Sequence, residues 1–294
     1  MTLKDLAQTF STDEQCRALL VKLRWPSGVE CLRCKSKKVF ELSDYAKFEC
    51  GECAYQFSVT TQTIFHDTHL PLDIWFMAVL LLVEARKGMS ANQLKRTLWG
   101  QHKGSYKTAW YLCHRIRAAM VEASQPKLTG TVEVDETFIG GKRPIERKRE
   151  KDIVVGIRQR NGTLRFFKAS DLKQETLYKI VADNVDKTVD VIVTDEFSSY
   201  NFDLTQYRGK HKTIRHKDKI YVQGEVHTNT VESAFSLLKR GIAGTWHRLS
   251  AKHLPAYLNE MTFRFNRRKN ADLFIDTLRH MVTAPVLTFE KLTA

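Results

Sequence analysis

The sequence predicts an α/β protein whose mixed sheet is flanked by helices and preceded by two smaller units, one held together by cysteines and one all-helical. Two CxxC pairs lie near the N-terminus, residues 71–128 follow a helical period, and after residue 130 the pattern becomes one of alternating β-branched strands. A chain of 294 residues is longer than a single core usually serves. We therefore expect units at residues 1–70, 71–128 and 129–294.

The charge of the chain favours a polyanionic partner. The sequence has 47 Lys and Arg against 33 Asp and Glu, a formal charge of +14, and residues 71–128 carry nine basic against three acidic side chains. Residues 129–228 carry nineteen basic against sixteen acidic side chains, which suits carboxylates that hold metal within a positive field that holds phosphates. A solvated mixed-charge surface fits the totals equally well. The apolar run from Ile74 to Val83 is too short to cross a bilayer, and no signal-peptide core precedes it. We therefore expect a cytoplasmic, nucleoid-associated protein without a membrane partner.

The cysteine unit has the spacing of a zinc ribbon at about residues 28–58. Cys31 and Cys34 form one CxxC pair, Cys50 and Cys53 form the other, and fifteen residues separate the pairs. Each pair directs two thiolates at one tetrahedral ion, and the intervening hairpin brings the pairs together. Disulfide pairing is the alternative, which the absence of a signal peptide disfavours. We expect a closed, structural Zn²⁺ site.

The next unit has the outline of a helix-turn-helix. We expect a helix from Asp73 to Arg86, a second from Asn92 to Trp99 and a third from Tyr106 to Val121. Ser90 is placed to cap the second helix, with Gln93 where a capping box has its partner residue. A plain helical bundle has the same capping and turn residues, but the basic third helix favours DNA. The predicted contacts there are Lys107, Arg115 and Arg117.

The third unit has the element order of an RNase-H-like core. Strands are expected at Thr131–Ile139, Asp152–Gln159 and Thr163–Ala169, the last two joined by an Asn-Gly turn. A helix from Lys173 to Asp186 follows, and then a short buried strand from Val189 to Thr194. Asp135 lies inside the first strand, and Asp195 directly follows the fourth.

A late amphipathic helix supplies a third acid. Within the predicted helix Thr230 to Arg240, Glu232 and Lys239 are seven residues apart and share one face. Asp135, Asp195 and Glu232 can converge in one cleft, where cations must offset their repulsion. Three carboxylates with two Mg²⁺ or Mn²⁺ ions are an arrangement for in-line phosphoryl transfer.

Three segments carry a family resemblance: TVEVDETFIGGK, VTDEFSSY and HTNTVESAFSLLKRG. They resemble the catalytic blocks of DDE-type insertion-sequence transposases, in particular the bacterial group with an N-terminal zinc ribbon and an ISXO2-like transposase domain, related to the Merlin elements. The resemblance covers nearly the whole chain, including a C-terminal YLNEMTFRFNRR block.

The resemblance implies the roles of the site residues. It makes Asp135, Asp195 and Glu232 the metal-binding triad, Lys239 a basic partner further along the helix, and Asn229 a supporting residue. From the residues alone, Glu133 and Glu136 rival Asp135, Glu196 rivals Asp195, and Glu232 could serve only the helix dipole. Further DNA contacts are expected at Lys142, Arg143, Arg240, Arg267 and Arg268.

The implied activity is metal-dependent cleavage at the ends of an insertion sequence and strand transfer into target DNA. The partners are then double-stranded DNA, as terminal inverted repeats and as target, and a second copy of the chain, because two ends must be held together. Two alternatives stay open: a DNA-binding regulator without catalysis, and a nuclease of the same fold that cleaves without joining.

Overall fold

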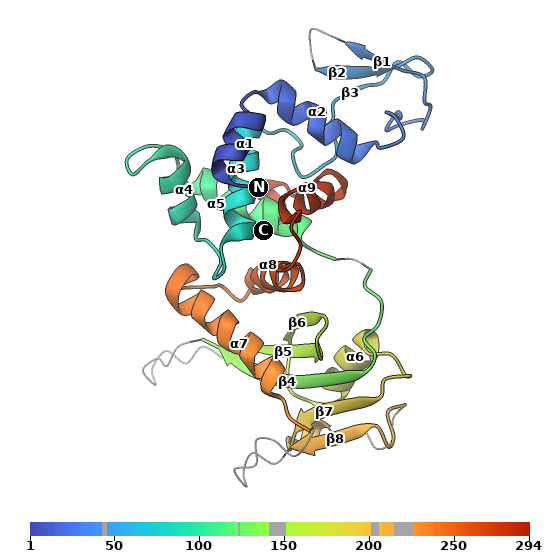
Figure 1. The fold of residues 1–294 in the computed structure, drawn as a ribbon, viewed down its shortest axis with the longest axis vertical. Coiled ribbons are helices and arrows are strands. Elements are labelled where there is room, and N and C mark those ends of the chain that lie inside the picture. The colour runs from blue at the N-terminus through green and yellow to red at the C-terminus, as the bar shows by residue number, and fades with distance from the viewer. Residues whose placement is uncertain (43–45, 123, 141–150, 201–205, 215–225) are drawn as a thin grey trace. The chain divides into compact units, whose positions relative to one another are not determined.

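The computed structural model describes residues 1–42, 46–122, 124–140, 151–200, 206–214 and 226–294, which form two compact units. Unit 1 comprises Met1–Val121 and Asn270–Ala294, and unit 2 comprises Glu122–Lys269. The predicted fold class is confirmed, because the chain has an N-terminal cysteine cluster, a helical segment and then a five-stranded mixed sheet with flanking helices (Figure 1). The division into functional domains at residues 1–70, 71–128 and 129–294 remains a prediction. The two compact units divide the chain differently, because residues 270–294 belong to the same unit as the N-terminal part.

Unit 1 combines helices with one small sheet. Its helices are α1 (Leu3–Thr9), α2 (Asp13–Arg24), α3 (Leu72–Glu84), α4 (Ala91–Trp99), α5 (Tyr106–Ala119), α9 (Leu273–Thr283) and α10 (Phe289–Thr293). An antiparallel sheet carries the cysteine pairs and has the order β1 (Val39–Leu42), β2 (Lys47–Cys50), β3 (Gln56–Phe57).

Helix α3 is a core helix of unit 1 because its sequence is apolar on almost every side. Eight of its thirteen residues are buried, and it contacts α1, α2, α4, α5 and α9. The cap of α4 is as predicted, since Ser90 Oγ accepts the Gln93 N–H at 3.1 Å. The Gln93 side chain donates to Thr97 Oγ1 at 3.3 Å, however, so the hydrogen bonding differs from a full capping box.

Unit 2 is built on the sheet order β6-β5-β4-β7-β8. The strands are β4 (Thr131–Ile139), β5 (Asp152–Gln159), β6 (Leu164–Ala169), β7 (Val191–Asp195) and β8 (His211–Ile214). β4 pairs antiparallel with β5 and parallel with β7, so the sheet is mixed and β4 is its central strand. β8 has no counterpart among the strands expected from the sequence.

Helices cover both faces of this sheet. The helical elements of unit 2 are α6 (Gln174–Asn184), η2 (Ser198–Tyr200), α7 (Asn229–Gly241), η4 (Ile242–Trp246) and α8 (Leu254–Asn266). One core lies between the sheet and α6 and includes Val132, Val134, Leu177 and Val181. The other lies between the sheet, α7 and α8. Within the described part of the chain, every helix is too short or too polar to span a membrane.

Candidate active site

The four paired cysteines form a compact cluster in unit 1. The Sγ atoms of Cys31 and Cys53 lie 3.6 Å apart, those of Cys34 and Cys50 lie 3.4 Å apart, and all four lie within 4.8 Å of one another. A tetrahedral zinc ion with Zn–S bonds of about 2.3 Å separates its sulfurs by about 3.8 Å. A disulfide needs about 2.05 Å, and all six cysteines are free. The cluster therefore supports a structural zinc ion and contradicts disulfide pairing.

The two CxxC turns have matching backbone geometry. Lys35 and Ala54, each directly after the second cysteine of its pair, have left-handed φ angles of 62° and 52°. Their N–H groups donate to Cys31 O at 3.0 Å and Cys50 O at 2.9 Å. Although burial raises the pKa of Cys31, backbone N–H groups directed at its sulfur lower this pKa to about 6 overall. A thiolate is the form that binds zinc.

In unit 2, the two aspartates of the proposed triad occupy corresponding positions on neighbouring strands. The parallel ladder between β4 and β7 pairs residues 131–133 with residues 191–193, an offset of 60. The same offset relates Asp135 to Asp195, where the two strands run past their last paired residues. Asp195 is the last residue of β7, and its Oδ1 accepts the Phe197 N–H at 3.1 Å.

The three acids of β4 have different surroundings. Glu133 is completely buried and accepts hydrogen bonds from Arg160 and from the first turn of α7. Glu136 accepts a hydrogen bond from the buried Tyr200 hydroxyl at 2.6 Å. Asp135 and Glu136 both line an open pocket with a volume of about 570 Å³. Glu133 is thus set apart as an internal anchor, while Asp135 and Glu136 are available to the pocket.

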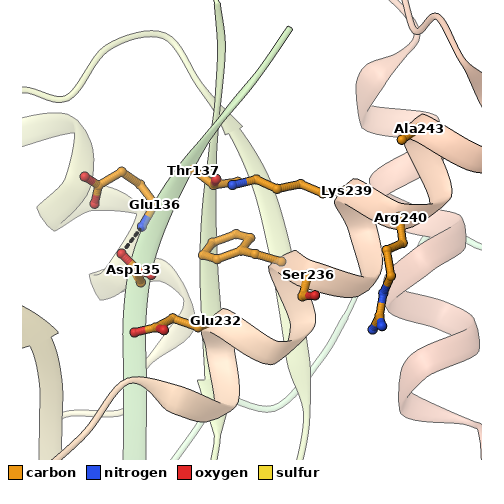
Figure 2. Close-up of a pocket in the computed structure, with 9 residues that line it drawn as sticks. Asp135, Glu136, Thr137, Glu232, Ser236, Lys239, Arg240 and Ala243 are labelled. Carbon is orange, nitrogen blue, oxygen red and sulfur yellow. Dashed lines mark hydrogen bonds between the residues drawn. The ribbon is translucent and has the colours of Figure 1, made fainter. Parts of the chain in front are cut away.

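Helix α7 forms the other wall of this pocket. Its residues Glu232, Phe235, Ser236, Lys239 and Arg240 line the pocket, so Glu232 and Lys239 do share a face. Figure 2 shows the carboxylate of Glu232 directed toward β4 near Asp135, and the Lys239 side chain extended toward Thr137. Thr228 Oγ1 donates to Glu232 Oε1 at 2.6 Å and orients that carboxylate.

A glycine allows α7 to lie close to the sheet beside Asp135. Gly156 of β5 is the register partner of Asp135. A Cβ atom at this position would lie 2.8 Å from Phe235 Cζ and 2.9 Å from Val231 Cγ2. Only a residue without a side chain permits this approach of the helix.

The charges of the pocket oppose ionisation of Asp135. Burial, followed by the negative charges of Glu136, Asp195 and Glu232, raises the pKa of Asp135 to about 7, although the Glu136 N–H opposes this effect by donating to Asp135 Oδ1 at 2.8 Å. Burial and Asp195 also raise the pKa of Glu136, against the lowering effect of the Tyr200 hydrogen bond. Asp195 and Glu232 are therefore close enough to Asp135 to act on it electrostatically.

The carboxylates are more widely spread than the cysteines. Among the described residues, the four cysteines are the only group of three or more His, Cys, Asp or Glu side chains whose ligand atoms all lie within 4.8 Å of one another. The cysteine cluster is thus the one compact group of candidate metal ligands in the described part of the chain.

Two predicted DNA contacts in unit 1 are buried in the structure. Arg115 and Arg117 are only 5% and 1% exposed. Arg115 donates to His66 O at 2.6 Å and lies over the Trp75 ring, and Arg117 donates to Met89 O at 3.5 Å. The middle of α5 is buried on all sides, so these guanidinium groups join parts of unit 1 instead of facing a phosphate.

The other predicted basic contacts and Asn229 have varied settings. Lys107 is exposed, with its ammonium group 4.3 Å from the centre of the Phe289 ring. Arg240 lines the pocket but points away from the carboxylates (Figure 2). Arg267 forms an ion pair with Glu122, and Arg268 is exposed and donates to Phe265 O. Asn229 is the exposed first residue of α7, and Lys142 and Arg143 lie outside the described residues.

Four residues that shape the site were not predicted from the sequence: Glu133, which holds α7; Gly156, which lets α7 approach; Tyr200, which binds Glu136; and Thr228, which binds Glu232. A lone glycine inside the predicted strand DIVVGIRQ was the one available signal, because such a glycine often marks a close approach by another element. The partners of Glu133 and Glu136 lie 97 and 64 residues further along the chain, beyond the reach of local patterns.

Comparison with known proteins gives consistent matches along the chain. The family described as the ISXO2-like transposase domain matches residues 127–266, and the transposase zinc-ribbon domain matches residues 11–56. A protein from Halobacterium salinarum, described as an uncharacterized protein in transposable element ISH50, is 28% identical over 280 residues, covering 87% of this chain and 92% of the relative. The chain therefore belongs to the transposases that combine a zinc ribbon with an ISXO2-like transposase domain.

Proposed function

We propose that the protein cuts DNA at the ends of an insertion sequence and joins the freed 3′ ends to target DNA, with Asp135, Asp195 and Glu232 as its metal-binding triad. One observation carries this proposal: Asp135 and Glu232 line one open pocket, where burial and then the charges of Glu136, Asp195 and Glu232 raise the pKa of Asp135 to about 7. Such a cluster is poised to bind cations, which would relieve its internal repulsion.

The donor atoms fit Mg²⁺ or Mn²⁺, which prefer carboxylate oxygen. Asp135, Asp195 and Glu232 would hold these ions through their carboxylate oxygens. When bound, the ions would supply activation of the attacking oxygen and stabilisation of the leaving oxygen in an in-line displacement.

The remaining pocket residues suit a DNA strand. Lys239 and Arg240 give the rim two positive charges, and Phe235 contributes apolar surface. The Lys239 ammonium group can hold a phosphate as a compact point charge close to the carboxylates. The hydrogen bond from Thr228 orients the Glu232 carboxylate, so this carboxylate is already in place before the substrate binds.

A basic surface of unit 1 is proposed to hold duplex DNA. Residues 85–121 contain eight Lys and Arg and no Asp or Glu. With Arg115 and Arg117 buried, the remaining cations are Arg86, Lys87, Lys95, Arg96, Lys103 and Lys107. Helix α4 exposes Asn92, Gln93 and Arg96, which are residue types that bind base edges and phosphates. Strand transfer joins two element ends, so we expect at least a dimer in the active complex.

The triad is tested by Mn²⁺-dependent nicking of a DNA fragment that carries an element end. Asp135→Asn and Glu232→Gln are expected to abolish nicking while duplex binding persists. The matched control is Asp190→Asn, an exposed acid just before β7, which should nick as the unmodified protein does. Undiminished nicking by either triad variant would refute the assignment.

The same assay separates the two alternatives. A precut end with a free 3′-OH isolates the joining step. Transfer of this end into plasmid DNA is expected here, whereas a nuclease would cleave the uncut fragment and leave the precut end unjoined. A DNA-binding regulator would bind both substrates and process neither.

A further inference from the structure

Glu133 is a fully buried carboxylate that lies beneath the N-terminus of α7. Its Oε2 accepts hydrogen bonds from the Thr230 N–H at 2.9 Å, the Thr230 hydroxyl at 2.7 Å and the Val231 N–H at 3.1 Å. Its Oε1 accepts from Arg160 Nε at 2.8 Å, and His227 Nδ1 lies 3.4 Å away. This carboxylate is therefore held inside the protein by donors of Arg160 and of the first turn of α7.

These bonds replace the usual cap of a helix. The first N–H groups of an α-helix have no partner within the helix and favour a negative charge. Thr228 holds the N-cap position of α7, but its hydroxyl donates to Glu232 and makes no cap hydrogen bond. Glu133, which lies 97 residues before Thr230, accepts the N–H groups of the first turn instead.

The anchor joins β4 and α7, two of the three elements that carry the proposed metal ligands. Glu133 and Asp135 are on the same face of β4, two residues apart. Val231 directly precedes Glu232, so the bond from its N–H to Glu133 restrains the backbone next to that carboxylate. Arg160 also donates to His227 O at 3.1 Å, which ties the segment before α7 to the same point.

Glu133 also differs from the triad in charge balance. The Arg160 guanidinium forms an ion pair with it, so its charge is compensated inside the protein. Asp135, in contrast, is acted on by the negative charges of Glu136, Asp195 and Glu232. Glu133 is thus equipped to support structure and not to hold a cation.

We infer that Glu133 is a positioning residue that sets Glu232 against Asp135 and so determines how tightly the pocket binds divalent cations. This inference rests on the proposed function. It concerns a residue that touches neither DNA nor metal and acts only through α7.

The test uses the full-length protein with Glu133→Gln. This variant keeps the shape of the side chain, but its amide NH₂ must meet either Arg160 or the α7 donors, so a donor faces a donor. We expect hydrogen exchange of the Thr230 and Val231 amides in metal-free protein to accelerate by about tenfold or more. The Mn²⁺ concentration for half-maximal nicking should rise about 10–100-fold, with DNA affinity unchanged. The control Glu175→Gln, an exposed acid in the first turn of α6, should change neither quantity.

A milder variant covers the case in which Glu133→Gln fails to fold. Thr230→Val removes only the 2.7 Å hydroxyl bond and keeps both backbone N–H groups. It should shift amide exchange and Mn²⁺ dependence in the same direction by a smaller factor. Folded variants with faster exchange but unchanged Mn²⁺ dependence would overturn the inference, as would unchanged exchange.

Failure of the proposed function gives a different result. If the unmodified protein shows no Mn²⁺-dependent nicking, the transposition chemistry fails. Calorimetric Mn²⁺ titration then still tests the anchor, because Glu133→Gln should weaken cation binding whatever reaction the site performs. Equal affinity in this titration would overturn the inference by itself.

Discussion

The close approach of α7 to the sheet depends on Gly156, which makes Gly156→Ala a sharp perturbation of the site. Gly156 lies between Asp135 on β4 and Phe166 on β6 in the sheet register. A methyl group there would project toward α7, into the space between Phe235 and Val231. The substitution adds a single carbon atom and no charge, so its effects report on packing alone.

The size of the effect follows from the contacts. The new Cβ would lie 2.8 Å from Phe235 Cζ, whereas ordinary contacts begin at 3.4 Å, so the helix or the ring must retreat by about 0.6 Å. The Phe235 ring has little freedom to turn because it stacks on Phe166 with centroids 5.4 Å apart. Overpacking of this kind costs about 1–3 kcal/mol of folding free energy. Since a displacement of about 1 Å can cost about 100-fold in rate, we expect nicking to fall by roughly tenfold.

Denaturant unfolding and Mn²⁺-dependent nicking check the two parts of this prediction. Gly244→Ala is the matched control, because a Cβ there meets no atom within 4 Å and should be neutral. Adding Phe235→Leu to Gly156→Ala removes the nearest ring atom and should restore part of both quantities. The reasoning is refuted if Gly156→Ala is as stable and as active as the unmodified protein.

Four further predictions concern the zinc site, the charge of the pocket, the basic surface and the buried Arg115. Elemental analysis should find one zinc ion per chain. Cys34→Ser should abolish zinc binding and make residues 28–58 susceptible to protease, because the ribbon folds around the ion. A ribbon that resists protease without zinc would contradict the site. Because the folded-state pKa of Asp135 is raised to about 7, the free energy of unfolding without added divalent ions should fall as pH rises from about 4 through 7. The loss should be at most about 4 kcal/mol. Asp135→Asn should flatten this pH dependence in denaturant titrations. Arg96→Ala should reduce the slope of log affinity against log salt by about 0.9 in DNA-binding titrations, whereas Arg279→Ala, also exposed in unit 1, should leave it unchanged. Arg115→Ala should instead lower thermal stability, since its guanidinium is buried, and a changed salt slope with unchanged stability would count against that role.

Local patterns were sufficient for most of unit 2. The strands β4 and β5 begin and end at the predicted residues, because alternating β-branched residues mark each strand locally. The Asn-Gly turn after β5 likewise specifies the hairpin of β5 with β6. The four cysteines were predictable for a similar reason, since ligand spacing within each CxxC pair is a local property. β8 has only four residues and is stabilised by pairing with β7, so its sequence gave no comparable signal.

Burial was the property that sequence could not supply. Arg115 and Arg117 look like a basic helix face, but α5 is surrounded by other parts of unit 1, and backbone carbonyls with aromatic rings replace water around them. The acids of β4 were ambiguous for the same reason. Glu133, Asp135 and Glu136 differ mainly in their partners from distant segments, and side-chain alternation alone could not distinguish an anchor from a ligand.

Two contacts hold α7 in different directions, and both act at Val231. Its N–H bonds to Glu133, which fixes the helix along its axis, and its Cγ2 lies against Gly156, which fixes the distance to the sheet. Glu232 is the next residue and is therefore tightly positioned, whereas Lys239 lies two turns further along the helix, away from both contacts. This difference suits the proposed roles. A carboxylate that binds a metal must be placed within a few tenths of an ångström, but an ammonium group that attracts a phosphate as a point charge tolerates a looser position.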